Sequence, residues 1–131
     1  MAGYFEKLQA LQSKAHAPYS QFQVAAILVM RDGQEVHGVN VENASYGGTI
    51  CAERSAFVSA VSQQGNTDQY AAIHLLAGKG DKFVMPCGMC RQVMSEFVPA
   101  DFPVFLYNCH GEQRQVSMGE LLPFAFSQAD L

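Results

Sequence analysis

Hydrophobic and polar positions alternate along the chain in patterns that predict an α/β fold. In residues 3–15, Tyr4, Leu8 and Leu11 fall on one helical face. Helical spacing also marks residues 51–63, 86–98 and 118–122. Apolar or alternating runs typical of strands are residues 22–30, 34–39, 71–77, 103–107 and 114–117. Hairpins combined with alternating strands and helices favour an α/β sandwich built on a mixed sheet.

Turn signals separate these segments. Asp32-Gly33 predicts a two-residue hairpin between the first two strands. Gly65-Asn66 is expected to end the second helix, and Pro86 suits the first position of the third helix. Residues 110–113 predict a second hairpin turn. No repeat or linker interrupts the pattern, and the length is that of one typical domain, so residues 1–131 are expected to form a single domain.

Composition and charge narrow the possible partners. Charged residues make up 15% of the chain, against about 25% in an average soluble protein. This shortage is compatible with surface buried against another subunit. The net charge is −4 and no Lys/Arg cluster is visible, which disfavours nucleic acids and anionic membranes as partners.

The cysteines are interpreted through the expected compartment. Residues 1–7 show neither a basic segment nor an apolar one, and no apolar run reaches the ~20 residues of a membrane span. A cytoplasmic location is therefore expected, where thiols stay reduced. The four cysteines then become candidates for metal binding or catalysis: Cys51, Cys87, Cys90 and Cys109.

Two short stretches carry the candidate chemistry, Cys51-Ala52-Glu53-Arg54 and Pro86-Cys87-Gly88-Met89-Cys90-Arg91-Gln92. Each lies at an expected helix start, where the helix dipole favours thiolates. Three thiolates at two helix ends would form a tetrahedral zinc site that lacks a fourth protein ligand, which is the catalytic pattern. The alternatives are a redox C-x-x-C motif and a structural zinc completed by Cys109 or His110.

These stretches resemble the zinc-dependent cytidine deaminases, whose signature is a ligand-x-Glu motif followed by P-C-x-x-C. The resemblance to the small single-domain members extends to residues 18–27, 38–56, 86–92 and 121–126. Met89 and Phe124 depart from the usual family residues but occupy no ligand position. The resemblance implies a three-layer α/β/α sandwich with a central mixed five-stranded sheet, and a homotetramer with composite active sites.

The chemistry expected of this motif follows from its residues. Zinc lowers the pKa of bound water towards ~7, but three thiolates would leave the metal unit negatively charged. Helix N-termini and a neighbouring arginine can compensate. In the family, an arginine at the position of Arg54 donates hydrogen bonds to sulfur, and Arg54 is favoured over Arg91 for this task. Either arginine could instead form a surface salt bridge. Glu53 is the expected acid/base, which requires a pKa raised by burial.

Further residues are assigned to the substrate mainly through the resemblance. Asn40 and Glu42 alternate along a strand end and are expected to face the same way, towards the ribose 3′-hydroxyl; without the resemblance they could equally be turn residues. The carboxylate would disfavour phosphorylated substrates. The resemblance places Phe22 against the nucleoside, and Ala52 and Cys87 on the pyrimidine through their backbones. Tyr46 and Phe126 match positions that reach a neighbouring subunit's site, although packing alone could explain both.

The sequence therefore predicts a zinc enzyme that deaminates cytidine and 2′-deoxycytidine hydrolytically in pyrimidine salvage. The expected site is Glu53 as catalytic residue, Cys51, Cys87 and Cys90 as zinc ligands, Arg54 beside the thiolates, and a substrate pocket of Phe22, Asn40, Glu42, Tyr46, Ala52 and Phe126. The nearest rival within deaminases is a nucleoside-antibiotic deaminase of the blasticidin S type. A polynucleotide deaminase fits less well, because those families resemble a His-x-Glu first motif. A zinc-stabilised binding module without turnover is the alternative of a different class.

Overall fold

The computed structural model describes residues 3–65 and 67–131, which are organised around one five-stranded sheet. The strands are β1 (Val24–Met30), β2 (Glu35–Val39), β3 (Tyr70–Ala77), β4 (Pro103–Tyr107) and β5 (Gln113–Ser117). Their order is β2-β1-β3-β4-β5. Only the β3–β4 pair is parallel and the other pairs are antiparallel, so the expected mixed sheet is confirmed.

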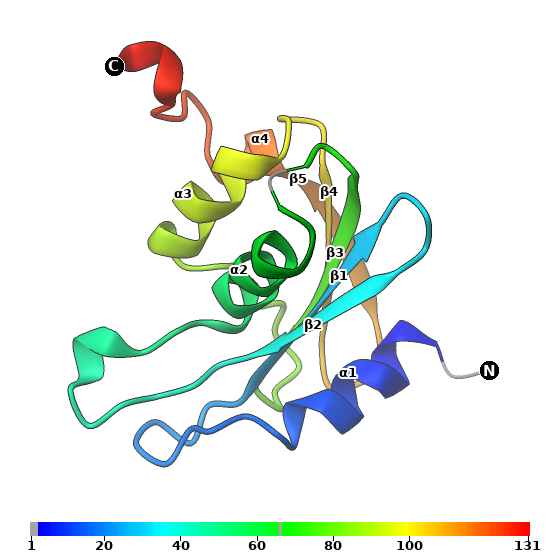
Figure 1. Ribbon diagram of the computed structural model, residues 1–131. Helices are drawn as coiled ribbons and strands as arrows, with labels where there is room; N and C mark the ends of the chain where they lie inside the picture. Colours follow the sequence, from blue (N-terminus) through cyan, green and yellow to red (C-terminus); the bar gives the residue numbers. More distant parts are fainter. Residues whose placement is uncertain (1–2, 66) are drawn as a thin grey trace.

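Helices cover both faces of this sheet (Figure 1). Helix α1 (Tyr4–Gln12) packs on one face through Leu8, against Ile27 and Leu76. Helices α2 (Ala52–Gln64) and α3 (Gly88–Phe97) cover the other face, where Phe57 and Met94 join the larger apolar cluster. Neighbouring residues of β1 alternate between the two clusters, as the period of a strand requires. The three-layer α/β/α arrangement is therefore confirmed.

Most predicted elements lie within two residues of their observed bounds, but three details were wrong. The first hairpin has a three-residue loop, because Met30 N–H donates to Gln34 O and Gly33 adopts φ +90°, the usual geometry of such loops. Strand β1 begins at Val24 and not at residue 22, so Phe22 lies in the preceding segment. Pro86 precedes the N-cap of α3 instead of opening the helix, because Cys87 is still extended. Asn66 lies outside the described residues.

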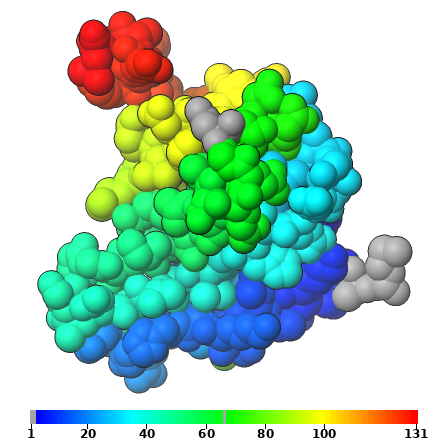
Figure 2. Space-filling view, in the orientation of Figure 1, coloured from blue at the N-terminus to red at the C-terminus, as the bar shows by residue number. Residues whose placement is uncertain are grey.

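The remaining short elements lie at the periphery of the sheet. A 3₁₀ turn, η1 (Tyr46–Gly48), follows β2, and the four-residue helix α4 (Met118–Leu121) follows β5. The C-terminal segment with η2 (Gln128–Asp130) stands apart from the main body (Figures 1 and 2). Among the described residues, no helix combines the length and apolar character needed to cross a bilayer.

Candidate metal centre and active site

Three cysteine sulfurs meet where α2 and α3 begin. The Sγ atom of Cys87 lies 3.9 Å from that of Cys51 and 3.4 Å from that of Cys90, and all three lie within 4.8 Å of one another. Tetrahedral zinc with Zn–S bonds of about 2.3 Å holds its sulfurs about 3.8 Å apart. The cluster therefore fits a zinc ion. Cys109 and His110, the alternative fourth ligands, do not belong to this group.

Local backbone geometry explains why the sulfurs converge. Cys51 and Cys87 are the N-cap residues of α2 and α3, and both keep extended backbones. Neither sulfur caps its own helix through a hydrogen bond. Each is therefore free to point away from its helix, while the positive end of the helix dipole favours the thiolate form. Cys90 lies one turn into α3 and is fully buried.

Arg54 lies beside this cluster and donates from Nη2 to Cys51 Sγ at 3.3 Å. The same nitrogen lies 3.3 Å from the carbonyl oxygen of Thr49. Hydrogen bonding by the neighbouring Cys90 thiol and by Arg54 lowers the pKa of Cys51 to about 5. Arg91 instead donates to the carbonyl oxygens of Pro86 and Leu121, at 2.7 and 2.8 Å. Of the two arginines, Arg54 is thus the one placed to compensate thiolate charge.

Glu53 follows the first ligand on α2 and is only 6% exposed. It lines the same cavity as Cys51 and Cys87. Burial, the largest influence, raises the pKa of this carboxyl to about 6. A carboxyl with a pKa near neutrality can both accept and donate a proton at physiological pH, as general acid–base catalysis requires.

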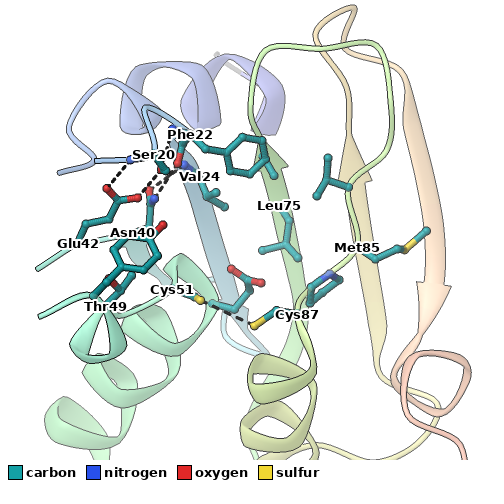
Figure 3. A pocket seen from close by; sticks show the side chains of 15 residues that line it. Ser20, Phe22, Val24, Asn40, Glu42, Thr49, Cys51, Leu75, Met85 and Cys87 are labelled. Carbon is teal, nitrogen blue, oxygen red and sulfur yellow. Dashed lines mark hydrogen bonds between the residues drawn. The ribbon is translucent and has the colours of Figure 1, made fainter. Parts of the chain in front are cut away.

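The cavity that contains these groups measures about 290 Å³, close to the lower end of the range for small-molecule sites. Figure 3 shows it from close by, with the cysteine sulfurs at one end and Asn40 and Glu42 at the other. Its wall combines these polar groups with apolar side chains from β1, β3 and the loop before α3. The lining residues are Ser20, Phe22, Val24, Asn40, Glu42, Tyr46, Thr49, Cys51, Glu53, Leu75, Ala77, Val84, Met85, Pro86 and Cys87.

Asn40 and Glu42 follow β2, and both are buried at the cavity wall, while Val41 between them is exposed. Glu42 Oε1 accepts the N–H groups of Tyr19 and Ser20, each at 3.0 Å, and its Oε2 accepts the Ser20 hydroxyl. These hydrogen bonds lower the pKa of Glu42, that from the Ser20 hydroxyl most strongly. The carboxylate therefore stays ionised at the cavity.

Asn40 uses its amide to hold the segment in front of β1. Its Nδ2 donates to Phe22 O at 2.8 Å, and its Oδ1 accepts from Val24 N at 2.9 Å. One amide hydrogen and one lone pair remain for a ligand. Asn40 and Glu42 therefore combine the two roles that the sequence left open: each organises a turn, and each faces the cavity.

The aromatic candidates separate into two groups. Phe22 is 42% exposed and lines the cavity, and Tyr46 lines it as well, within the same chain. Phe126 is 57% exposed and is absent from the lining; its carbonyl oxygen accepts from Gln92 Nε2 at 3.0 Å. Ala52 is fully buried at the start of α2. Most candidates therefore line one cavity. Cys90, Arg54 and Ala52 lie at the same helix starts but are not part of its lining, and Phe126 lies in the C-terminal segment.

Sequence reasoning missed several residues of this wall. Ser20 lies in the stretch 18–27 that resembles the family, but a single serine in a loop carries no signal for a contact with Glu42. Leu75 and Ala77 share one face of β3, which their spacing of two could have indicated. Thr49, Val84 and Met85 belong to irregular segments, and their positions carry no periodic signal. Cys109, a candidate fourth ligand, is half-buried and lies outside the sulfur cluster.

Comparison with known proteins agrees with this geometry. The family model described as "Cytidine and deoxycytidylate deaminase zinc-binding region" matches residues 2–106. A cytidine deaminase of Halalkalibacterium halodurans is 47% identical over 96% of this chain and 92% of its own length. A cytidine deaminase of Sporosarcina psychrophila is 43% identical, over 96% and 93%.

A crystal structure of cytidine deaminase from Burkholderia pseudomallei has a TM-score of 0.88 and 45% identity, covering 96% of this chain and all of that one. The cysteine cluster suits the metal named in the family description. The chain belongs to the cytidine deaminase family, whose zinc-binding region it contains.

Proposed function

We propose that this protein catalyses the hydrolytic deamination of cytidine and 2′-deoxycytidine to the corresponding uridines, with release of ammonia. The observation that carries the proposal is the placement of Glu53. A buried carboxyl with a pKa of about 6 shares one cavity with two cysteines of the metal cluster. A closed structural zinc site would need four protein ligands and no neighbouring acid.

The residues divide the reaction among them. Cys51, Cys87 and Cys90 would hold zinc, which supplies a Lewis acid that makes water nucleophilic near neutral pH. Glu53 would accept a proton from the attacking water and pass it to N3 of the pyrimidine. It would then take the second proton of that water and deliver it to the C4 amino group, which leaves as ammonia. Arg54 would hold negative charge on Cys51.

The far end of the cavity suits the sugar of a free nucleoside. Asn40 offers an amide hydrogen, and Glu42 has lone pairs left to accept from a hydroxyl. The residues that line the cavity include two carboxylates but neither lysine nor arginine. A phosphate would meet like charge there without a compensating cation, which supports nucleosides over nucleotides as substrates.

Assembly is part of this proposal. Phe126 lies outside the cavity of its own chain. Several other large apolar side chains are also exposed, among them Ile50, Val58, Met89 and Phe124. With only 15% charged residues, such a surface favours association with further copies. We therefore propose a homotetramer in which Phe126 of one chain stacks on the base bound by another. We further propose that the chain is a single catalytic domain that acts in pyrimidine salvage. A cytoplasmic location would keep its free cysteines reduced.

The direct test follows the ultraviolet absorbance of nucleosides mixed with purified protein, with and without a zinc chelator. Cytidine and deoxycytidine should lose their absorbance and release equimolar ammonia, and the chelator should abolish this. Blasticidin S and a single-stranded oligodeoxynucleotide serve as competing substrates. Faster turnover of either, or turnover of none, would contradict the proposal.

A further inference from the structure

The ring of Phe22 is seated on a glycine. Figure 3 shows the ring extending from the segment before β1 towards the end of β3. Gly78, the first residue after β3, has φ +71°. A Cβ atom built on Gly78 would lie 2.6 Å from Cε1 and 3.2 Å from Cζ of Phe22. No side chain larger than hydrogen therefore fits between the backbone and the ring unless the ring moves.

Gln12 links the two segments that carry Phe22 and Gly78. It ends α1 and is only 5% exposed. Its Nε2 donates to Gln23 O at 2.9 Å and to Gly78 O at 2.8 Å. Gly78 N–H also donates to Gln23 O, at 2.9 Å. Both amide hydrogens of Gln12 thus bind the carbonyl next to Phe22 and the carbonyl beneath its ring.

The hydrogen bonds of Phe22 involve its backbone. Its N–H donates to Ser20 Oγ at 3.0 Å, and its carbonyl accepts from Asn40. Phe22 is 42% exposed as a residue and lines the cavity, so the orientation of its ring depends on the groups packed against it. The backbone of Gly78 packs against the edge of this ring that carries Cε1 and Cζ.

We infer that Gln12 and Gly78 are positioning residues, which hold the Phe22 ring against the cavity and thereby set nucleoside affinity without touching the substrate. Neither residue belongs to the polar machinery of Glu53 and the cysteines, which stands on α2 and α3. The inference rests on the proposed function only in the choice of ligand. Disturbing either residue should weaken nucleoside binding and leave the chemical step largely intact.

The first test is Gly78→Ala. The added methyl group pushes the ring into the cavity, so the KM for cytidine should rise about tenfold, while kcat changes by less than about twofold. Equilibrium titration with uridine should show the same loss of affinity, independently of turnover. Zinc content should equal that of the parent. An unchanged KM and uridine affinity would overturn the inference.

Two control variants separate the ring contact from general backbone effects. Gly65→Ala places a side chain at a similar φ of +74°, and Gly80→Ala changes the same loop; a Cβ at either position meets nothing within 4 Å. Both should bind uridine like the parent. If Gly65→Ala weakened binding as much as Gly78→Ala, backbone strain and not ring position would be responsible.

A double-mutant cycle decides whether Phe22 transmits the effect. In the Phe22→Leu background, which lacks the ring, Gly78→Ala should change uridine affinity by less than about twofold. Equal effects in both backgrounds would refute the link to Phe22. Gln12→Leu, which removes both donated hydrogen bonds at similar size, should weaken uridine binding, whereas Gln9→Leu on the exposed side of α1 should not.

These outcomes are distinguishable from failure of the proposed function. A parent protein that binds uridine but does not deaminate cytidine would contradict the reaction and leave the positioning test intact. A parent that deaminates cytidine, with Gln12→Leu and Gly78→Ala both folded and binding normally, would contradict the positioning inference alone.

Discussion

The Arg54 guanidinium donates a hydrogen bond to the Cys51 sulfur, with Nη2 and Sγ 3.3 Å apart. Sequence spacing brings these residues together because Cys51 is the N-cap residue of α2 and Arg54 lies in its first turn. The guanidinium cannot lose its charge at physiological pH. It therefore opposes the negative charge that three thiolates would accumulate around a divalent ion.

Replacing Arg54 tests this relationship. Arg54→Gln removes the positive charge and should lower kcat or zinc affinity by about 10- to 100-fold, the range found for groups that hydrogen-bond to metal ligands. Arg91→Gln is the matched control, because Arg91 donates to backbone carbonyls and not to sulfur. Arg91→Gln should lower the melting temperature and leave kcat nearly unchanged. Equal kcat values and zinc affinities in parent and Arg54→Gln would contradict the assigned role.

Cys87→Ala tests metal ligation. The variant should lose zinc and unfold at lower temperature, since the free energy of metal binding also stabilises the fold. Cys109→Ala provides the control, because Cys109 is outside the sulfur cluster. Zinc content by elemental analysis and melting temperature are measured for both. Full zinc content in Cys87→Ala would show that this sulfur is not a ligand.

Glu42→Gln tests the sugar end of the cavity. The amide would place a donor where the carboxylate accepts hydrogen bonds from Ser20 and, in the proposed complex, would accept one from a nucleoside hydroxyl. The KM for cytidine should rise by about 10- to 100-fold, as expected for the loss of a hydrogen bond to a charged group. Binding of the free base cytosine, which lacks the sugar, should change little. Glu96→Gln, an exposed position on α3, should leave both values unchanged. Equal losses for cytosine and cytidine would argue against sugar recognition.

His74 makes stability depend on pH. The side chain is 6% exposed on β3, stacked between Tyr4 and Phe105, with Nδ1 2.8 Å from the Tyr107 hydroxyl. Burial lowers its pKa to about 4, from the ordinary 6.5. Above pH 6.5 the histidine is neutral in both folded and unfolded chains. Between pH 6.5 and about 4, only the unfolded chain binds the proton. The free energy of unfolding therefore falls as the pH falls, by about 3 kcal/mol in total.

His74→Phe removes this titration and keeps the aromatic stack. Gln113 still donates to the Tyr107 hydroxyl at 2.9 Å, so that oxygen keeps a partner. Denaturant unfolding of parent and variant at several pH values between 7.5 and 4.5 isolates the histidine, since other titrations cancel in the difference. The parent should lose more stability than the variant over this window. Parallel curves would show that His74 does not carry the effect.

Much of this architecture follows from local sequence. Continuous or alternating apolar runs predicted the strands. The cysteines at two helix starts predicted the metal cluster, because N-cap residues place their side chains at helix tips. Hairpin loop length was wrong, since Asp32-Gly33 is compatible with both two- and three-residue loops. Such choices depend on strand register, which a short motif does not encode.

The missing parts of the site depend on contacts between distant segments. Val84 and Met85 line the cavity from an irregular loop. Gly78 contacts Phe22, from which it is separated by more than fifty residues in the sequence. Gln12 would be taken for a polar residue on an exposed helix face, yet it is buried against two carbonyl groups. Nothing in the local pattern distinguishes these residues from ordinary loop and surface positions.

In the proposed reaction, Glu53 moves the protons while Cys51, Cys87 and Cys90 hold the zinc. The most direct measurement compares the initial rate of cytidine absorbance loss in parent and Glu53→Gln, with zinc content determined on the same samples. We predict that the variant keeps the zinc content of the parent and loses about 10²- to 10⁴-fold in rate. A variant that retains both its zinc and the parent's rate would show that Glu53 is not the proton-transfer residue.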